Sequence, residues 1–488
     1  MSSPVEIAFK NFIHIDYNSK TPIYLQICEQ FIKAIQLGYL PEGTKLPGSR
    51  LLSKELNINR NTLVKSLEEL QTQDWIAILP NKGCFILSEN KRTKKSFGIE
   101  RTAEKEINYN FVRSTILDTP SHTSESRLYF TDGATDLRIE PIEQIYKSYI
   151  SILRNQSKNK LSESEIYFQS HNQILNYLNI SRGLRASANH LFITSNHQTA
   201  LYLVGKLLIN KSDKIIVTNL GYHIANMIFS SLEAQLLSVR ITATGIDLEH
   251  LEYLCKNNNI KLLYLTSHYH YPTTISISPK QKIEIYNLAE KYNFIIIEDD
   301  YDFDFNYTSA SYPLMSFNAI SRIIYIGLFG KGLPVEFRFG FVIGASDLVK
   351  ELHKYNQIFS PNTNTSQLLT LTSLIEEGEL NRFLKKTRKI YKQRMLLLAK
   401  LLHAAPYINI DINLPNGGLA LWCHWQDNIN LSLLQKRCAN KGLFIPQNTL
   451  YQTKNIRASR IGFAHLNESE IKLACSILLQ EAKIIKNY

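Results

Sequence analysis

The strongest constraint on the fold of this chain is a series of short apolar runs that alternate with helical stretches beyond Tyr129. Polar or turn-forming residues bound each run, as they bound a strand. The runs are HLFIT, KIIVTN, KLLYLTS, FIIIEDD and RIIYIGLF. Strands that are apolar throughout are typical of a parallel sheet that helices cover on both faces. We therefore predict an α/β domain over residues 126–488.

The part of the chain ahead of this domain has a different composition. Residues 15–88 combine helical apolar spacing with a short hairpin signal, whereas SENKRTKKSFGIERTAEKEINYN is polar and charged. We predict a small folded domain at 15–88 and a linker at 89–125. The 488 residues of the chain are enough for roughly two or three domains, each with its own core.

Charge and cysteine content narrow the function. Lys and Arg total 55 against 43 Asp and Glu, and the net charge of +12 favours an acidic partner, nucleic acid first. The 6 cysteines include no Cys-x-x-Cys pair, which excludes a zinc finger and argues against a disulfide scaffold, so we expect no metal site. The N-terminus lacks an apolar signal core and no apolar run is long enough for a bilayer. We therefore expect a cytoplasmic protein without a membrane partner.

Residues 15–88 have the pattern of a helix-turn-helix. One face of the first helix carries apolar side chains at helical spacing, namely Tyr24, Cys28, Phe31 and Ile35. A second, short helix lies in LPGSRLLSKEL. After a break at 57–59, Asn59 is a suitable N-cap for a third helix, whose buried stripe is Leu63, Leu67 and Leu70. The hairpin signal WIAILPNKGCFIL then predicts a wing.

In a helix-turn-helix the second helix of the motif enters the major groove with its N-terminus first. The residues that would meet DNA there are Arg60, Asn61, Thr62 and Lys65. The alternative is a small helical domain with a solvated basic face. We favour DNA binding because the helix order, the cap, the wing and the basic positions all agree.

This block resembles the winged-helix domain of GntR-family transcription regulators. The resemblance is carried by PIYLQI, by LPGSR before the second helix, by INRNTL at the start of the third and by KGCF in the wing. It implies that Arg50 and the wing tip, Lys82 and Gly83, also contact DNA.

In the predicted α/β domain, reactive side chains follow two strands at their carboxyl ends, where open α/β sheets bind ligands. Asp299 and Tyr301 close the run FIIIEDDY, and Lys331 follows RIIYIGLF between Gly330 and Gly332. A lysine in this position can form an imine with a carbonyl compound, and a nearby acid can keep a pyridine nitrogen protonated. These are the requirements of a pyridoxal phosphate (PLP) site.

Other residues suit the remaining parts of PLP. Arg338 could pair with the phosphate and Tyr222 could stack on the ring. The turn Ser195-Asn196-His197-Gln198 opens a helix whose free N–H groups would point at the phosphate. Each residue alone has an ordinary alternative, since a strand-end Asp is often a cap, a Lys is usually solvated and a loop Tyr usually packs. Order and spacing together favour the cofactor site.

The whole chain resembles the MocR subfamily of GntR-family regulators, in which a winged helix precedes a fold-type I aminotransferase-like domain. Further matching stretches are YFTDGATDL, SRGLRASANHLFITSNHQTAL, TSHYHYPTT, GGLALW and SRIGFAHL. The resemblance implies that Lys331 forms a Schiff base with PLP, that Asp299 contacts the pyridine nitrogen and that Tyr301 contacts the ring hydroxyl. It also implies that Arg460 holds the carboxylate of an amino-acid-like effector and that the chain forms a homodimer.

Several positions depart from the family pattern. Leu328 and Gly330 stand where the family usually has small hydroxyl residues that help to hold the phosphate. Asn196 replaces a usual Gly in the phosphate turn, and Thr274 replaces the Gly that normally follows Pro-Thr. These departures predict a weaker hold on PLP and little aminotransferase turnover.

Three functions are compatible with these features. The first is a PLP-dependent DNA-binding transcription regulator whose aminotransferase-like domain senses PLP, an amine or an amino acid. The alternative is a PLP-dependent aminotransferase with an accessory DNA-binding head, so transaminase chemistry stays open. The third is a regulator whose sensory site has lost PLP and serves as a dimer scaffold. The complete head disfavours the second function, and Lys331, Asp299 and Arg338 disfavour the third. The expected partners are double-stranded operator DNA, a small effector and a second copy of the chain.

Overall fold

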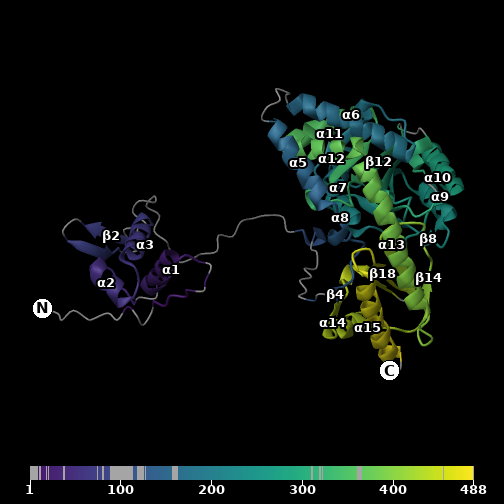
Figure 1. The fold of residues 1–488 in the computed structure, drawn as a ribbon. Coiled ribbons are helices and arrows are strands. Elements are labelled where there is room, and N and C mark those ends of the chain that lie inside the picture. The colour runs from purple at the N-terminus through teal and green to yellow at the C-terminus, as the bar shows by residue number, and fades with distance from the viewer. Residues whose placement is uncertain are drawn as a thin grey trace. The chain divides into compact units, whose positions relative to one another are not determined.

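The computed structural model describes two separate units of the chain, Met1–Val112 and Arg113–Tyr488 (Figure 1). The described residues are 9, 13–17, 19, 21–36, 39–73, 75–79, 82–87, 114–117, 126, 128–156, 163–308, 312–317, 320, 322–359, 365–453 and 456–486. Of the predicted linker, 89–125, only 114–117 are described, and Thr115–Leu117 form a 3-10 helix that contacts helix α8 (His223–Ser231) of the same unit. The domain boundaries remain a prediction.

The N-terminal unit is a helix-turn-helix followed by a wing. Its elements are α1 (Ile23–Gln36), β1 (Lys45–Leu46), α2 (Ser49–Glu55), α3 (Arg60–Thr72), β2 (Ile76–Leu79) and β3 (Gly83–Ile86). The strands form an antiparallel sheet in the order β1-β3-β2. Asn59 caps α3, because its side chain accepts a hydrogen bond from the Asn61 N–H at 2.8 Å. The predicted helices, cap and hairpin are all present.

The core of this unit joins α1 to the helix-turn-helix. The predicted stripe Leu63, Leu67 and Leu70 of α3 is buried there. On α1 the face differs slightly from the prediction, because Ile27 and Ala34 are buried beside Cys28 and Phe31 while Tyr24 and Ile35 are only half-buried. The helix is therefore rotated by part of a turn relative to the face that the spacing suggested.

The centre of the C-terminal unit is a seven-stranded sheet in the order β5-β13-β12-β11-β10-β6-β7. Its strands are β5 (Leu191–Thr194), β6 (Lys214–Thr218), β7 (Gln235–Val239), β10 (Ile260–Leu265), β11 (Ile295–Asp300), β12 (Ile323–Phe329) and β13 (Phe339–Ile343). All the predicted runs are strands of this sheet. The predicted runs all share one direction, as expected of a parallel sheet. Strand β13, which was not among them, is antiparallel to both of its neighbours.

Helices cover both faces of this sheet, as the apolar strands predicted. On β10, Leu263 and Leu265 belong to the core shared with α5, α6, α9, α10 and α12, whereas Leu262 and Tyr264 belong to the core shared with α7, α8 and α11. The helices are α5 (Ile142–Gln156), α6 (Glu163–Arg182), α7 (His197–Leu208), α8 (His223–Ser231), α9 (Leu248–Asn257), α10 (Pro279–Tyr292), α11 (Ser346–Phe359) and α12 (Thr365–Glu376). No helix within the described ranges is long and apolar enough to cross a membrane.

A smaller subdomain completes the C-terminal unit. Its four-stranded sheet has the order β14-β15-β18-β17, formed by β14 (Ile410–Ile412), β15 (Ala420–Trp425), β18 (Arg457–Gly462) and β17 (Leu450–Gln452). Helices α14 (Leu431–Asn440) and α15 (Glu468–Lys486) pack with it, and β4 (Leu128–Tyr129) pairs with β16 (Leu443–Phe444). The long helix α13 (Glu379–His403) joins the large sheet to the smaller subdomain (Figure 1). Its Phe383 lies in the core of the large sheet and its Leu398 lies in the core of the subdomain.

Candidate functional site

The predicted DNA-contacting residues lie on α2, at the start of α3 and in the wing. Arg50, Arg60 and Asn61 are exposed, and Thr62 is half-buried. The guanidinium Nε of Arg60 donates to Ser49 Oγ at 3.2 Å, which links the starts of α2 and α3. Such a contact orients a long side chain that would otherwise sample many rotamers. Their contact with DNA stays a prediction.

The other basic residues of this surface are Lys65 and Lys82. The Lys65 ammonium lies 4.1 Å from the ring centroid of Tyr24, which is a cation–π contact that holds the lysine beside α1. Lys82 and Gly83 are exposed at the start of β3, and Gly83 has φ +112°. A glycine suits this wing tip because it adopts positive φ without strain.

In the C-terminal unit, the predicted site residues meet at the carboxyl edge of the large sheet. Strands β5, β6, β11 and β12 all end at this edge, since β5 and β12 are each antiparallel to β13. A cavity of about 540 Å³ opens there. Its walls are Asp132, Ser195, Asn196, His197, Gln198, Tyr222, Tyr271, Tyr301, Leu328, Lys331, Val335 and Arg338. Of the predicted cofactor residues, Asn196, His197, Tyr222, Tyr301, Lys331 and Arg338 are thus brought together.

Lys331 follows β12 and is held at the cavity wall by an acid. Its ammonium forms an ion pair with the buried carboxylate of Asp302 and lies 5.0 Å from the Tyr301 ring centroid. Gly330 before it has φ +75°, and a Cβ there would lie 2.7 Å from the carbonyl oxygen of Phe337. The backbone therefore requires glycine where the family usually has a small hydroxyl residue.

Asp299 lies behind the cavity wall and not in it. His197 Nε2 is 2.7 Å from its Oδ1, and the Tyr264 hydroxyl donates to its Oδ2 at 2.5 Å. A carboxylate has roughly four lone-pair sites, so Asp299 can accept a further donor beside these two. His197, which contacts Asp299, itself lines the cavity.

Tyr222 packs against another aromatic wall residue. Its ring meets that of Tyr271 edge-to-face with centroids 5.2 Å apart. Burial raises the pKa of the Tyr222 hydroxyl above its usual value, and the nearby Asp299 carboxylate adds to this. Tyr222 therefore stays neutral and offers an apolar ring face to the cavity.

The sequence pattern of the aminotransferase class I and II family matches residues 131–478. The chain belongs to this family. The pattern of bacterial regulatory proteins of the gntR family matches residues 23–86, which are the helix-turn-helix and the wing. The N-terminal unit is accordingly a GntR-type DNA-binding domain in front of an aminotransferase domain, the arrangement of the MocR subfamily.

Relatives with the same arrangement match most of the chain. The uncharacterized HTH-type transcriptional regulator YdeL of Bacillus subtilis is 23% identical over 92% of this chain and 95% of its own length. The probable rhizopine catabolism regulatory protein MocR of Rhizobium meliloti is 21% identical over 88% of this chain and 87% of its own. A kynurenine aminotransferase from Pyrococcus horikoshii has the same fold, with a TM-score of 0.66 and 22% identity over 74% of this chain and 92% of that chain.

PLP is the cofactor of the aminotransferase class I and II fold, and the cavity of this aminotransferase-like domain fits it. A volume of about 540 Å³ is within the range of small-ligand pockets, roughly 300–1,000 Å³. It has an amine at Lys331 and aromatic faces at Tyr222 and Tyr301, and the buried carboxylate of Asp299 lies directly behind its wall. These are the groups that an aldehyde, a pyridine nitrogen and a flat ring require.

The end of the cavity that would take the phosphate differs from the family pattern. Leu328 lines it and cannot donate a hydrogen bond, and the Asn196 side chain caps α7 by accepting from Thr199 N–H at 2.8 Å. The backbone N–H groups of His197 and Gln198 come before the Thr199 N–H that Asn196 caps. They lie at the N-terminus of α7, where an anion such as phosphate is favoured. Arg338 supplies the positive charge, with its Nε donating to the Leu333 carbonyl at 2.7 Å.

Arg338 also faces a buried acid that sequence reasoning missed. Its Nη2 lies 3.5 Å from Glu140 Oε1, and the Glu140 side chain is only 2% exposed. Burial raises the pKa of Glu140 to about 7, which the nearby Arg338 opposes only in part. Near neutral pH, Glu140 thus titrates beside the residue predicted to hold the phosphate.

Replacing Glu140 with Gln should stabilise the aminotransferase-like domain at alkaline pH. The raised pKa means that the folded state binds the Glu140 proton more tightly than the unfolded state does. The stability that this proton contributes is fully present below about pH 4.5 and is lost as the pH rises through about 7. Gln resembles the protonated acid at every pH. We expect nearly equal melting temperatures near pH 4 and an advantage of order 1–2 kcal/mol for Glu140→Gln at pH 8. Thermal unfolding at both pH values measures it, and a constant difference would contradict the assignment.

Two further acids were missed although both lie in motifs that the sequence displayed. Asp302 stands in the run FIIIEDDYDFDF, where its alternation with Asp300 could have suggested a second acid near the lysine. Asp132 stands in YFTDGATDL, far from the other site residues along the chain. Its carboxylate accepts from Arg460 Nε at 2.7 Å and from the Tyr271 hydroxyl at 2.8 Å. Arg460 therefore lies behind Asp132 and does not line the cavity.

Proposed function

We propose that this protein is a PLP-dependent transcription regulator in which the GntR-type domain binds operator DNA and the aminotransferase-like domain senses PLP or an amine or amino-acid effector. The observation that carries the proposal is the presence, in one chain, of exposed basic residues on α3 and of Lys331 in the wall of the cavity at the edge of the large sheet. We propose a cytoplasmic location, because the bacterial regulatory proteins whose pattern the N-terminal unit matches act on DNA in that compartment.

In this function each site residue has a separate task. Lys331 holds the cofactor through its amine, and Asp302 positions that amine through their ion pair. Asp299 supports the pyridine nitrogen, with His197 fixing the carboxylate, and Tyr222 covers the ring. Bound PLP supplies an electrophilic carbon with which an effector amine can combine. An effector shifts DNA binding to the extent that it binds two arrangements of the protein with different affinities.

The alternative function is an aminotransferase with an accessory DNA-binding head. Lys331 and Asp299 favour it, because the same two groups would serve in transamination. The pairing of Arg460 with Asp132 opposes it, because the arginine then lacks a free edge for an amino-acid substrate. Multiple-turnover transfer of an amino group from a common amino acid would support this alternative.

DNA binding by the full chain tests the proposed function. We expect the protein to bind DNA from upstream of its own gene, with an affinity that falls steeply as salt rises, because bound phosphates release counterions. Adding PLP should change that affinity. A gel-shift titration with and without PLP measures both effects, and identical binding curves would contradict the sensing role.

We also propose that the chain forms a homodimer. Helix α5 carries a stripe of apolar side chains that are each 41–47% exposed, namely Ile142, Tyr146, Ile150 and Leu153. Their spacing places them on one face of the helix. A contiguous exposed apolar face of this kind is typical of an interaction surface.

Light scattering should give twice the chain mass of 56.1 kDa for the wild type. Ile150→Asp should shift the protein toward the monomer, because it places a charge in the apolar stripe. The matched control is Ile180→Asp on α6, where the isoleucine is 85% exposed and lies outside the stripe. A monomeric wild type at micromolar concentration would contradict the dimer.

A further inference from the structure

We propose that the effector of this protein is a primary amine that carries no carboxylate, because Asp132 already fills the place at Arg460 that an effector carboxylate would need. The inference rests on the proposed function, in which Lys331 and PLP form the effector site. It narrows the effector class from amines and amino acids to amines alone.

The guanidinium of Arg460 has a contact on each of its nitrogens. Its Nε donates to Asp132 Oδ1 at 2.7 Å, its Nη1 donates to the Pro272 carbonyl at 2.9 Å and its Nη2 lies 3.5 Å from the Tyr301 hydroxyl. One face of the guanidinium lies 4.9 Å from the Tyr271 ring centroid. The side chain is 1% exposed. The Nε donor that a carboxylate would use in a bidentate pair is therefore already bound to the Asp132 carboxylate, and the buried side chain presents no N–H to the cavity.

Asp132 is the charged group that faces the cavity in its place. Its side chain is 30% exposed and lines the cavity, whereas Arg460 does not. A ligand carboxylate at this point would meet a fixed negative charge at short range, which disfavours binding. A second ammonium group at this point would pair with the Asp132 carboxylate and lie near the rings of Tyr222, Tyr271 and Tyr301, which also suit a cation. A neutral alkyl chain would contact the same rings without meeting repulsion from Asp132.

The backbone on both sides of Asp132 is held in place. On one side, Gly462 N–H donates to the Thr131 carbonyl at 2.9 Å, next to Arg460 on β18, and Thr131 Oγ1 lies 3.1 Å from His465 Nδ1. On the other side, the Asp136 carboxylate accepts from Arg394 Nη1 at 2.8 Å and its N–H donates to the Tyr391 hydroxyl at 3.2 Å.

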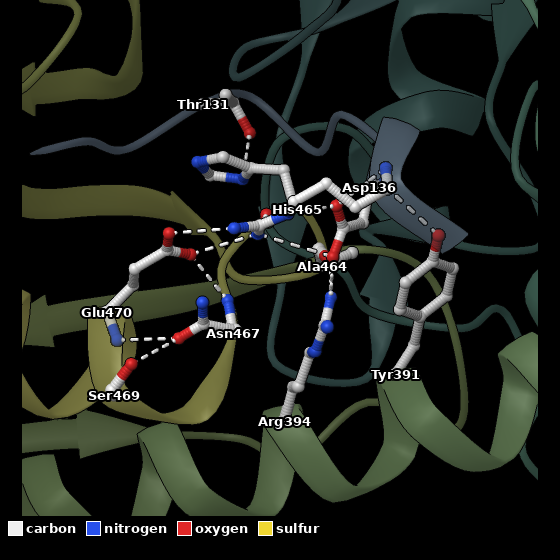
Figure 2. Close-up of polar contacts among 10 residues, drawn as sticks. Thr131, Asp136, Tyr391, Arg394, Ala464, His465, Asn467, Ser469 and Glu470 are labelled. Carbon is white, nitrogen blue, oxygen red and sulfur yellow. Dashed lines mark hydrogen bonds and ion pairs between the residues drawn. The ribbon is translucent and has the colours of Figure 1, made fainter. Parts of the chain in front are cut away.

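Figure 2 shows these contacts of Thr131 and Asp136 with the small subdomain and with α13. Asp136 is tied further through Arg138, which donates to Asp136 and to Glu470. Because both flanks are anchored, an incoming carboxylate could reach Arg460 only by displacing the Asp132 side chain from two hydrogen bonds. The cost of that displacement would weaken the binding of an amino acid but not the binding of an amine.

The experiment uses pairs of ligands that differ only in the carboxylate. Full-length protein loaded with excess PLP is titrated with 1,5-diaminopentane against L-lysine, and with ethylamine against L-alanine. The readouts are the visible absorbance of the lysine-bound PLP and the melting temperature. We expect each amine to half-saturate at a concentration about tenfold or more below that of its amino acid, because breaking one charge-assisted hydrogen bond lowers affinity by about one power of ten.

Two variants separate the role of Asp132 from general damage. Asp132→Asn keeps the shape and the acceptor for Arg460 but removes the charge, so we expect the preference for amines to shrink. Asp132→Ala frees the Arg460 edge, and we expect amino acids to bind at least as well as amines. Wild-type protein that takes L-lysine or L-alanine as tightly as the matching amine would overturn the inference while leaving PLP sensing intact. Failure of PLP to load at all would contradict the proposed function, and this inference with it.

Discussion

Lys331→Ala should remove all covalently held PLP from the protein. Lys331 is the lysine at the carboxyl edge of the sheet that lines the cavity, and Asp302 fixes its amine there. Wild-type protein in excess PLP, reduced with borohydride and digested, should carry the cofactor mass on the peptide that contains Lys331. The variant should carry none. PLP must be in excess because Leu328 offers no hydrogen bond to the phosphate, where the family pattern usually has a hydroxyl residue.

The same variant should lose the effect of PLP on DNA affinity while still binding DNA without PLP, because the GntR-type domain has its own core. Lys350→Ala, on the exposed face of α11, is the matched lysine control and should behave as the wild type. If the wild type itself showed no labelled Lys331, the cavity would have no role in holding the cofactor. The domain would then be better explained as a dimer scaffold without PLP.

Arg60→Ala should weaken DNA binding by about 1–3 kcal/mol, or roughly 5- to 150-fold in Kd, if the guanidinium contacts a base edge. Arg60 is exposed at the first position of α3, and its contact with Ser49 orients it at the end of the helix that enters the groove. The salt dependence should change little if the contact is to a base, and its slope should fall if the contact is to a phosphate.

Gel-shift titration of the full chain on one DNA fragment measures this weakening. Lys33→Ala serves as the control, because Lys33 is an exposed basic residue in the last turn of α1 and outside the predicted interface. It should reduce binding far less than Arg60→Ala does. Equal affinities for Arg60→Ala and the wild type would remove Arg60 from the interface and would leave the wing and Lys65 as the main contacts to test.

The elements of both units could be predicted from the sequence because their signals are local. The Asn59 side chain caps α3 by accepting a hydrogen bond from the N–H of Asn61, only two residues away. The stripe Leu63, Leu67 and Leu70 follows the period of the helix itself. The apolar runs of the sheet are buried on both faces, so they needed no knowledge of their partners to be recognised as strands. Lys331 and Asp299 could be proposed as site residues because they stand at the carboxyl ends of such runs.

Only the tertiary structure decided how side chains distant in sequence pair with one another. Asp132 meets Arg460 across 328 residues, and this changes the expected role of Arg460 from an open carboxylate grip to one already filled. The antiparallel direction of β13 and the ion pair of Lys331 with Asp302 likewise depend on how whole elements pack. The physical reason is that local propensity is set within a few residues, whereas a charge pair forms only where many packing contacts have already brought two backbones together. The sequence by itself therefore determined the elements, the family resemblance and the reactive residue types, and the fold determined which charges remain free to bind a ligand.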